Sequence, residues 1–324
     1  MALFRRVFLC HLFAAIAGAG APAIAQEPPL KLIVGIAPGA GSDIVARLLG
    51  ERMAKTLKRP VIVENKPGAA GRIGNELVKA APPDGSTLLF TPVATMAIFP
   101  HSYAGQLRYD PFKDFTPVSH VANFVLGLAV SAQTPVQTLA DYVAWVKADP
   151  GKHGFFASPA AGSIPHFFGA MFGREAGIDL THVPYKGTAP ALQALLAGDV
   201  GAVLTVTADI KPLVAAGKVR LLAVGGETRD RAFPKVQTFK ELGYDLAASP
   251  WYALFAPAGT PSAVVDKLAR AAADAVREPA LNKQLTEMGF EPTGYGPKRL
   301  AEVLKADFEF WKEPIRISGY KPGD

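Results

Sequence analysis

Lys31-Leu-Ile-Val-Gly-Ile-Ala-Pro-Gly-Ala-Gly-Ser-Asp-Ile-Val-Ala-Arg47 is the stretch from which the fold can be worked out. After its first lysine it is apolar and β-branched, which is typical of a buried strand. A proline and two glycines follow, and they permit a tight turn that bulkier residues would forbid. Ser42 and Asp43 are favourable N-cap residues, and apolar residues follow them at helical spacing. The stretch predicts a strand, a glycine loop and a helix N-terminus.

A helix that begins next to a glycine loop can bind an anion. Its first backbone N–H groups are unpaired and carry partial positive charge, and the glycines let a carboxylate or phosphate approach closely. The same junction also occurs in α/β domains that bind nothing there, because tight turns need glycine. Taken alone, the motif leaves both interpretations open.

Strands and helices alternate along the rest of the chain. Strand, helix and strand joined by short links indicate a parallel sheet. A strong apolar strand at 121–130 and a returning strand at 251–256 are expected to cross between two lobes and to form the hinge. A helix around 280–288 and a final helix from 297 to about 315 are expected to close the chain, with no strand between them.

The expected fold class is therefore α/β, with two lobes and a mainly parallel sheet in each. Lobe 1 comprises residues 26–124 and 250–324, and lobe 2 comprises residues 125–249. Strand C-termini and helix N-termini from both lobes point into the cleft between such units, where ligands bind.

Residues 1–25 have the features of a secretory signal that is removed. Two arginines precede an apolar stretch, and Ala23-Ile24-Ala25 is an A-x-A cleavage site. Glycines and a proline interrupt the apolar stretch too early for a membrane anchor. We expect cleavage after Ala25 and a periplasmic mature protein.

Composition excludes several classes of protein. The single cysteine, Cys10, lies in the signal, so the mature chain can form neither a disulfide nor a thiolate metal site. The net charge of +6 becomes +4 once the two signal arginines are removed, and the basic residues are scattered. Nucleic-acid binding is therefore not indicated. The histidines lack zinc-binding spacing, and we expect no metal or other cofactor.

Motifs for catalysis are also missing. The chain has no G-x-S-x-G elbow and no P-loop, and Ile44 stands where a dinucleotide-binding loop needs its third glycine. Acids such as Asp209 are interpreted as caps at element ends. What remains is a set of loops rich in small and hydroxyl residues, which suits holding an anion without reacting with it. These loops are Pro38–Asp43, Thr91–Thr95, Ser158–Ser163, Lys186–Thr188 and Thr205–Thr207.

Several sequence blocks resemble one family when taken together and in order. They are residues 38–47, Val63-Glu-Asn-Lys-Pro-Gly-Ala-Ala-Gly71, Ala81-Pro-Pro-Asp-Gly-Ser-Thr-Leu-Leu89, Tyr109-Asp-Pro-Phe-Lys-Asp-Phe115, His182-Val-Pro-Tyr-Lys-Gly187 and Ala256-Pro-Ala-Gly-Thr-Pro261. Over essentially the whole mature chain, the sequence resembles the extracytoplasmic solute-binding (Bug) proteins of tripartite tricarboxylate transporters (TTT). The resemblance implies a type II periplasmic-binding-protein-like, Venus-flytrap fold. It also implies a non-catalytic monomer that captures a small carboxylate for the TTT membrane permease.

The resemblance also implies which residues contact the ligand. Main-chain amides and hydroxyls of both lobes are expected to hold it, with Lys186 either meeting the anion or remaining solvated. His166 matches a family position, where packing or capping is favoured over ligand contact. The implied ligand-binding residues are Gly39, Ala40, Gly41, Ser42, Asp43, Thr95, Ser158, Gly162, Ser163, Lys186 and Thr205.

The sequence departs from the family pattern at three places. The more polar Ser-Gly-Asn-Gly loop of the family is replaced here by Pro159-Ala160-Ala161-Gly162. Phe99 stands where asparagine is common in the family, and Thr205 stands where aspartate is common. These changes favour an organic acid with a hydrophobic or aromatic portion over an amino acid or citrate.

Two alternatives from other classes remain open. One is a secreted hydrolase that uses Ser42 or Ser158 with His166. The other is a sensory subunit that presents a ligand to a membrane kinase.

Overall fold

The first strand and helix lie where the sequence predicts them. In the computed structural model, which describes residues 27–318, 320 and 321, β1 (Leu30–Val34) leads through a loop into α2 (Gly41–Leu57). The N-cap residue is Ala40, with no side-chain cap. The interpretation of Ser42 and Asp43 as N-caps is therefore wrong, because both lie in the first helical turn. The expected cleavage after Ala25 falls outside the described residues.

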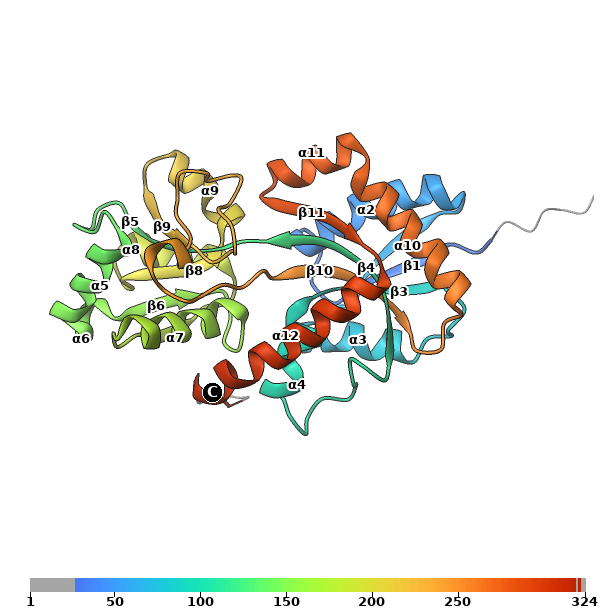
Figure 1. Ribbon diagram of the computed structural model, residues 1–324, viewed down its shortest axis with the longest axis horizontal. Helices are drawn as coiled ribbons and strands as arrows, with labels where there is room; N and C mark the ends of the chain where they lie inside the picture. The colour runs from blue at the N-terminus through green and yellow to red at the C-terminus, as the bar shows by residue number, and fades with distance from the viewer. Residues whose placement is uncertain (1–26, 319, 322–324) are drawn as a thin grey trace, which may run out of the picture.

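Lobe 1 contains a six-stranded sheet in the order β11-β4-β10-β3-β1-β2 (Figure 1). Helices from both parts of the chain cover it, and α10 packs beside α2. Its further elements are β2 (Val61–Asn65), η1 (Ala69–Gly71), α3 (Arg72–Lys79), β3 (Thr87–Pro92), η2 (Ala94–Ile98), α4 (Phe99–Ser102), β4 (Phe115–Phe124), β10 (Trp251–Pro257), α10 (Ser262–Arg277), α11 (Pro279–Glu287), β11 (Phe290–Tyr295) and α12 (Pro297–Ser318).

Lobe 2 contains a five-stranded sheet in the order β7-β6-β8-β5-β9. In Figure 1, α7 lies on one face of this sheet and α9 on the other. Its elements are β5 (Leu126–Ser131), α5 (Leu139–Ala148), α6 (Pro150–His153), β6 (Phe155–Ser158), α7 (Ile164–Ala176), β7 (Thr181–Pro184), α8 (Thr188–Ala197), β8 (Ala202–Val206), α9 (Thr207–Ala215), β9 (Val219–Val224) and η3 (Lys240–Leu242).

Both sheets are mixed, which corrects the expectation of mainly parallel sheets. In lobe 1, β1 pairs in parallel with β2 and β3, but β10 runs antiparallel to β3 and β4, and β11 is antiparallel to β4. In lobe 2, β5 is antiparallel to both β8 and β9. The cause is the double crossing: the chain leaves lobe 1 along β4 and returns along β10 in the opposite direction.

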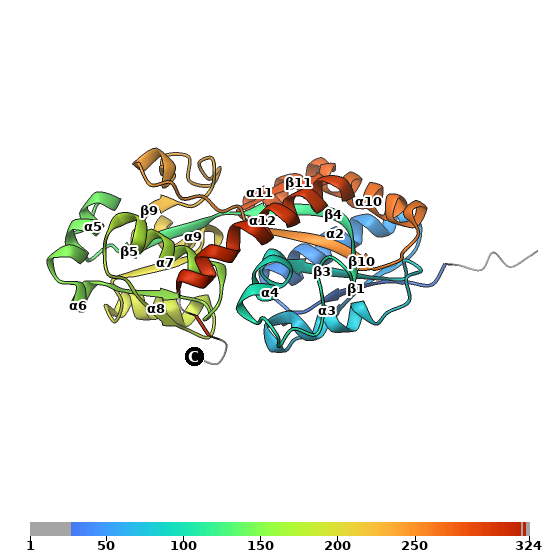
Figure 2. The same ribbon diagram turned by 60° about the horizontal axis from the view of Figure 1, so that its bottom comes forward.

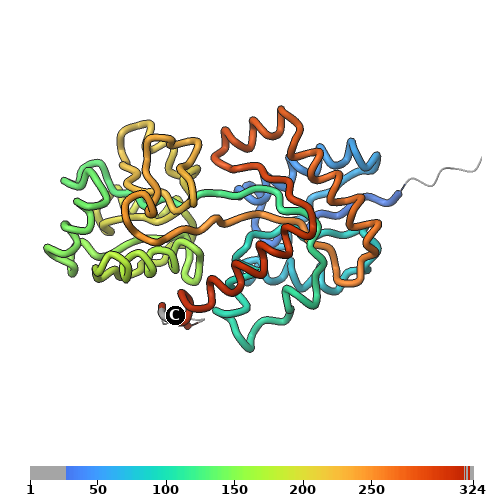
Figure 3. The backbone as a smooth tube through the Cα atoms, in the orientation of Figure 1, coloured from blue at the N-terminus to red at the C-terminus, as the bar shows by residue number. Residues whose placement is uncertain are grey.

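The two crossings lie side by side between the lobes (Figures 1 and 3). The outgoing one is not a single strand, because Val125 separates β4 from β5. The Phe124 backbone N–H donates to Pro250 O at 2.8 Å, which ties the outgoing crossing to the returning one. The lobes are thus joined by two short, hydrogen-bonded segments, as a hinge requires.

One element, β11, was not expected from the sequence, and the short helix expected within residues 91–99 is a π-helical turn. Strand β11 contains Pro292 and Gly294, which disfavour a strand, but it lies at the edge of the sheet where a proline is tolerated. Residues Ala94–Ile98 form a π-helical turn, η2, immediately after β3.

Helix α12 runs diagonally from lobe 1 toward lobe 2 (Figure 2). Near its middle, Phe308 O accepts a hydrogen bond from His101 Nε2 at 2.7 Å in lobe 1. Beyond the helix, the Tyr320 ring packs edge-on against Phe167 of α7, with centroids 5.6 Å apart, while its hydroxyl lies 3.4 Å from that of Tyr103 in lobe 1. The C-terminal segment therefore contacts both lobes.

Candidate functional site

The loop between β1 and α2 is held by Asp43, whose side chain points back over it. Asp43 Oδ2 accepts hydrogen bonds from the Gly39 N–H at 2.9 Å and from Arg47 Nε at 3.1 Å. Its other oxygen, Oδ1, accepts from Asn65 Nδ2 at 2.8 Å and lies 3.0 Å from Arg47 Nη2. Burial opposes ionisation of this carboxyl, but these donors outweigh it and lower the pKa of Asp43. The Gly39 amide is thus used within the loop, and the charge of Asp43 is balanced there.

The three amides that follow remain available at the start of α2. Among the described residues, no hydrogen bond uses the backbone N–H of Gly41, Ser42 or Asp43, as expected for the first turn of a helix. Tyr252 and Phe290 border this turn. A Cβ placed on Gly41 would lie 3.8 Å from the Tyr252 hydroxyl and 3.6 Å from Phe290 Cζ.

On lobe 2, the loop after β6 uses its own hydroxyls. The hydroxyl groups of Ser158 and Ser163 both donate to Ala160 O, at 2.9 and 2.7 Å. Ser163 is also the N-cap of α7, where its Oγ accepts from the His166 N–H at 3.4 Å. A Cβ on Gly162 would lie 2.8 Å from the Tyr320 ring, so this part of the loop is covered by the C-terminal segment.

Ser158 contacts His182 rather than His166. Its Oγ lies 2.7 Å from His182 Nε2, and because the serine hydroxyl donates to Ala160, His182 is the donor in this contact. The ring of His166 stacks on His182 at 3.8 Å, and its Nδ1 accepts from the Gly162 N–H. Burial lowers the pKa of His166 to about 4 and, together with the His166 charge, that of His182 to about 3. Among the described residues no hydrogen bond joins His166 to Ser158, whereas the hydrolase alternative that uses Ser158 requires His166 to accept the serine proton.

Thr95 and Phe99 are buried in lobe 1. The Thr95 hydroxyl lies 2.7 Å from that of Thr91 and also donates to Pro92 O, and the Thr95 carbonyl accepts from Tyr109 at 2.6 Å. Phe99 belongs to the hydrophobic core and packs edge-on against Tyr103. Phe99 therefore contributes to the core of the lobe.

A polar cluster on lobe 2 was only partly anticipated from the sequence. The Thr188 hydroxyl donates to Asp209 Oδ2 at 2.9 Å and lies 3.5 Å from that of Thr205. The Thr205 hydroxyl lowers the pKa of Asp209, against the larger effect of burial. Lys186, two residues before α8, is exposed and forms no ion pair within the described chain. The cluster joins the first residue of α8 to the end of β8 and the first turn of α9.

Asp209 and Tyr252 are the residues that sequence reasoning missed. Burial raises the pKa of Asp209 above its usual value, and burial together with the charge of Asp209 raises the pKa of Tyr252. The two residues belong to different lobes, Asp209 to the first turn of α9 and Tyr252 to β10. The available signal was an acid in the first turn of a helix that follows a strand end, which was interpreted as a cap.

The lobes also touch directly beside this cluster. Gly289 of lobe 1 has a positive φ of +86°, and a Cβ there would lie 2.8 Å from Ala208 Cβ of α9. One helical turn further, Lys211 Nζ donates to Glu287 O at 3.2 Å.

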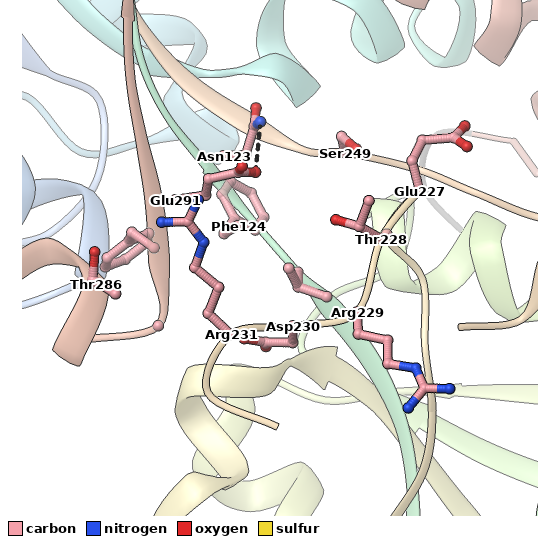
Figure 4. Close-up of a pocket in the computed structure, with 14 residues that line it drawn as sticks. Asn123, Phe124, Glu227, Thr228, Arg229, Asp230, Arg231, Ser249, Thr286 and Glu291 are labelled. Atoms are coloured by element: carbon pink, nitrogen blue, oxygen red, sulfur yellow. Dashed lines mark hydrogen bonds between the residues drawn. The ribbon is translucent and has the colours of Figure 1, made fainter. Parts of the chain in front are cut away.

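A separate cavity of about 290 Å³ lies at the hinge and is lined from both lobes. Figure 4 shows Arg231 pointing toward Glu291, which accepts a hydrogen bond from Asn123, while Arg229 points away and pairs with Glu241. None of the binding residues expected from the sequence lines this cavity.

Metal and membrane features were searched for within residues 27–318, 320 and 321. In that part of the chain, no group of three or more His, Cys, Asp and Glu side chains could hold a metal ion. Nor does it contain a helix with the length and apolar character needed to cross a bilayer.

Comparison with known proteins gives consistent matches. The family model described as "Tripartite tricarboxylate transporter family receptor" matches residues 45–319. "Protein BugT" of Bordetella pertussis is 31% identical over 325 residues, covering 99% of each chain. The solved structure of MatC from Rhodopseudomonas palustris with bound malate is 31% identical, with a TM-score of 0.77, and covers 89% of this chain and 99% of its own. R. palustris Rpa4515 with adipate is 29% identical, with a TM-score of 0.81, over 91% and 98% of the two chains.

Proposed function

The chain belongs to the tripartite tricarboxylate transporter receptor family, and from this premise we propose that it binds a small organic carboxylate between its lobes and passes it unchanged to a membrane permease. The resemblance drawn from the sequence and the two-lobed α/β fold are both confirmed. As a member of a periplasmic receptor family, the chain acts in the periplasm. MatC and Rpa4515 hold malate and adipate, which supports a small carboxylate as the ligand of this chain too.

The observation that carries this proposal is the set of unpaired amides at the start of α2. Three consecutive N–H groups, those of Gly41, Ser42 and Asp43, lie at the positive end of a 17-residue helix. The Asp43 charge is offset by Arg47, so it opposes an incoming anion less than a free carboxylate would. In this site Gly39 and Ala40 shape the loop, and the three amides bind the carboxylate.

Lobe 2 supplies the other wall of the site. Thr188 and Thr205 offer hydroxyls, and Lys186 is free to approach an anion from the exposed side. The loop after β6 has to rearrange before Ser158, Gly162 or Ser163 can reach a ligand. Thr95 acts indirectly, because its hydroxyl holds the end of β3 through Thr91. Contacts from both lobes favour the closed conformation, so ligand binding shifts the population toward closure about the two crossings.

A thermal-shift screen tests the proposal. The mature protein is heated with mono-, di- and tricarboxylates, and with the corresponding neutral amides as controls. A ligand present at 100 times its dissociation constant stabilises the folded state by about 2.7 kcal/mol. We expect at least one acid to raise the melting temperature while its amide does not. If no carboxylate in the screen raises it, the proposed function is wrong.

A pair of variants at Gly41 tests the amide site itself. Proline removes the N–H of the first helical residue but suits this position, and Ala40 already has the extended conformation (φ −71°, ψ 158°) that precedes a proline. Gly41→Ala keeps the N–H and places its Cβ at ordinary contact distances. We expect Gly41→Pro to weaken binding by about tenfold, which is the loss of roughly one hydrogen bond to a charged group. Gly41→Ala should bind nearly as the parent protein does; equal affinity for both variants would exclude the α2 amides.

The remaining parts of the proposal concern partners and catalysis. We infer that the protein is a monomer whose signal peptide is cleaved after Ala25. We also infer that it delivers its ligand to the TTT permease and does not react with it. Size-exclusion chromatography with light scattering tests the monomer, and N-terminal sequencing of the secreted protein tests the cleavage. Turnover of an ester or amide that is lost in Ser42→Ala or Ser158→Ala would instead favour the hydrolase.

A further inference from the structure

We propose that Arg231 of lobe 2 and Glu291 of lobe 1 are a pair of opposite charges that spans the hinge and restrains the rotation of one lobe against the other. Both residues line the hinge cavity of about 290 Å³. The inference concerns how the lobes move when no ligand is bound. It therefore goes beyond the proposed function and does not depend on the identity of the ligand.

Glu291 is anchored to the outgoing crossing where that crossing leaves lobe 1. It lies in β11 and pairs with Asn123 of β4, and the preceding pair of the same ladder is Phe290 with Phe124. Its side chain also accepts a hydrogen bond from Asn123 Nδ2 at 3.2 Å. Glu291 is thus held beside the last two residues of β4, on the lobe 1 side of the hinge.

Arg231 is anchored to the same crossing from the other side. The residue before it, Asp230, is buried and accepts a hydrogen bond from the Thr207 hydroxyl at 2.6 Å. The Thr207 N–H in turn donates to Val125 O at 2.9 Å. Val125 is the single residue between β4 and β5. The backbone of Arg231 is thus held close to this hinge residue, on the lobe 2 side.

The two charged side chains face each other across the cavity. Figure 4 shows Arg231 directed toward Glu291, whereas its neighbour Arg229 points away and pairs with Glu241 within lobe 2. Arg231 and Glu291 are both exposed, so water screens their attraction. The pair can therefore change the populations of different lobe arrangements by a few-fold, but it cannot lock the lobes.

A rotation at Val125 changes the separation of this pair directly, because one charge is held on each side of that residue. The attraction favours arrangements in which the cavity is narrow and opposes those in which it is wide. The restraint also depends on salt, since the screening length falls from about 10 Å at 0.1 M to about 3 Å at 1 M.

Charge reversal tests the pair, with lobe movement followed by single-molecule fluorescence energy transfer in the ligand-free mature protein. That chain has no cysteine once Cys10 is removed with the signal, so dyes can be attached at two introduced cysteines. Lys55→Cys on α2 and Lys147→Cys on α5 are exposed positions in different lobes. We expect Arg231→Glu and Glu291→Arg to shift the distribution of transfer efficiency in the same direction, with about a threefold change in the ratio of narrow to wide arrangements.

The double variant that carries both reversals separates a charge pair from two unrelated defects. It again places opposite charges across the cavity, so we expect it to restore the distribution of the parent protein. Arg229→Glu is the matched control, because it makes the same change of charge in the same loop on a side chain that points away from the cavity. It should leave the distribution unchanged. In 1 M salt, the two single variants should differ little from the parent protein measured in the same salt.

Two results would overturn the inference. One is that the double variant shows the sum of the two single shifts instead of the parent distribution. The other is that Arg231→Glu behaves as Arg229→Glu does. Because no ligand is present in these measurements, either result leaves the proposed carboxylate binding intact. Failure of every carboxylate in the thermal-shift screen would likewise leave the charge pair intact.

Discussion

Asp43 determines the conformation of the loop on which the proposed site depends. It is 3% exposed and receives hydrogen bonds from a backbone amide, an arginine and an asparagine. These donors come from the loop, from α2 and from the end of β2. One carboxylate thus fixes the loop against two neighbouring elements and leaves the first amides of α2 unoccupied.

Replacing Asp43 with alanine should therefore destabilise the protein and weaken ligand binding together. We expect the free energy of unfolding to fall by about 2–3 kcal/mol, because the Arg47 and Asn65 donors lose a charged acceptor. Urea denaturation and calorimetry measure the two effects. The control is Asp274→Ala on the exposed side of α10, which should change stability by less than about 0.5 kcal/mol. Unchanged stability of the Asp43 variant would show that the loop holds without this carboxyl.

The stacked rings of His166 and His182 should make the protein sensitive to acid. Their pKa values in the folded state are about 4 and 3, below the 6.5 of an unfolded histidine. Above pH 6.5 both states are neutral and nothing is lost. Below it, the unfolded chain binds protons that the folded pair does not, so stability falls by about 1.4 kcal/mol per pH unit for each histidine until the folded pKa is reached.

We expect the pair to cost roughly 3 kcal/mol of stability between pH 6.5 and pH 5. Asp307 acts in the opposite direction, because burial raises its pKa to about 6 and the folded state takes up that proton first. Unfolding should therefore be followed in the parent protein and in a variant with both His166→Gln and His182→Gln, since the Asp307 contribution cancels in the difference. Parallel pH profiles for the two proteins would refute this account.

At the scale of elements, α7 packs against β6 with no room for a side chain at Gly169. A Cβ there would lie 2.3 Å from Phe156 Cε2. Alanine is favoured over glycine in a helix by about 1 kcal/mol, but the clash within the core costs more. We expect Gly169→Ala to destabilise the protein by about 1–2 kcal/mol in urea denaturation, with an unchanged m-value.

Gly151 in α6 provides the matched control for this substitution. It is exposed, and the nearest atom to its Cβ position is Asp149 Oδ1 at 3.7 Å. Gly151→Ala should be neutral or slightly stabilising. If Gly169→Ala is equally neutral, the helix can move away from the sheet without cost.

The sequence was informative where an element is specified by its own residues. The β1–α2 unit, the two crossings and the final helix could be placed from apolar spacing and turn residues. Strand β11 could not, because Pro292 and Gly294 resemble a turn and only the pairing with β4 makes the segment a strand. The direction of β10 also depends on its neighbours rather than on its own residues.

The site was less predictable, because its important contacts join distant residues. The tertiary fold brings Ser158 to His182, Gly162 to Tyr320, and Thr188 to Asp209. Local patterns identified Thr188 and Thr205 only as loop residues. They did not indicate that an acid lies beside them.

At the scale of the whole molecule, Tyr320 connects the lobes independently of the hinge. Its ring contacts His166 and Phe167 of lobe 2, and its hydroxyl lies near that of Tyr103 of lobe 1. An aromatic contact of this kind contributes about 0.5–1.5 kcal/mol. We therefore expect Tyr320→Ala to shift the ligand-free protein toward an open form.

Small-angle scattering and stopped-flow binding measure this shift. The radius of gyration of the ligand-free variant should increase, and ligand dissociation should become up to about tenfold faster. Tyr320→Phe keeps the ring contacts and should behave as the parent protein. Identical scattering curves for the alanine variant and the parent would mean that the C-terminal segment does not restrain the lobes.

The central position of β10 in the sheet of lobe 1 has a consequence for how the chain acquires its structure. β3 and β4 do not pair with each other, because β10 lies between them and is made only after the whole of lobe 2. A nascent or partly exported chain that ends before Trp251 therefore exposes two unpaired strand edges, which favour aggregation. Lobe 2 is one continuous segment and can acquire its sheet first, whereas lobe 1 must wait until translation and secretion have delivered β10.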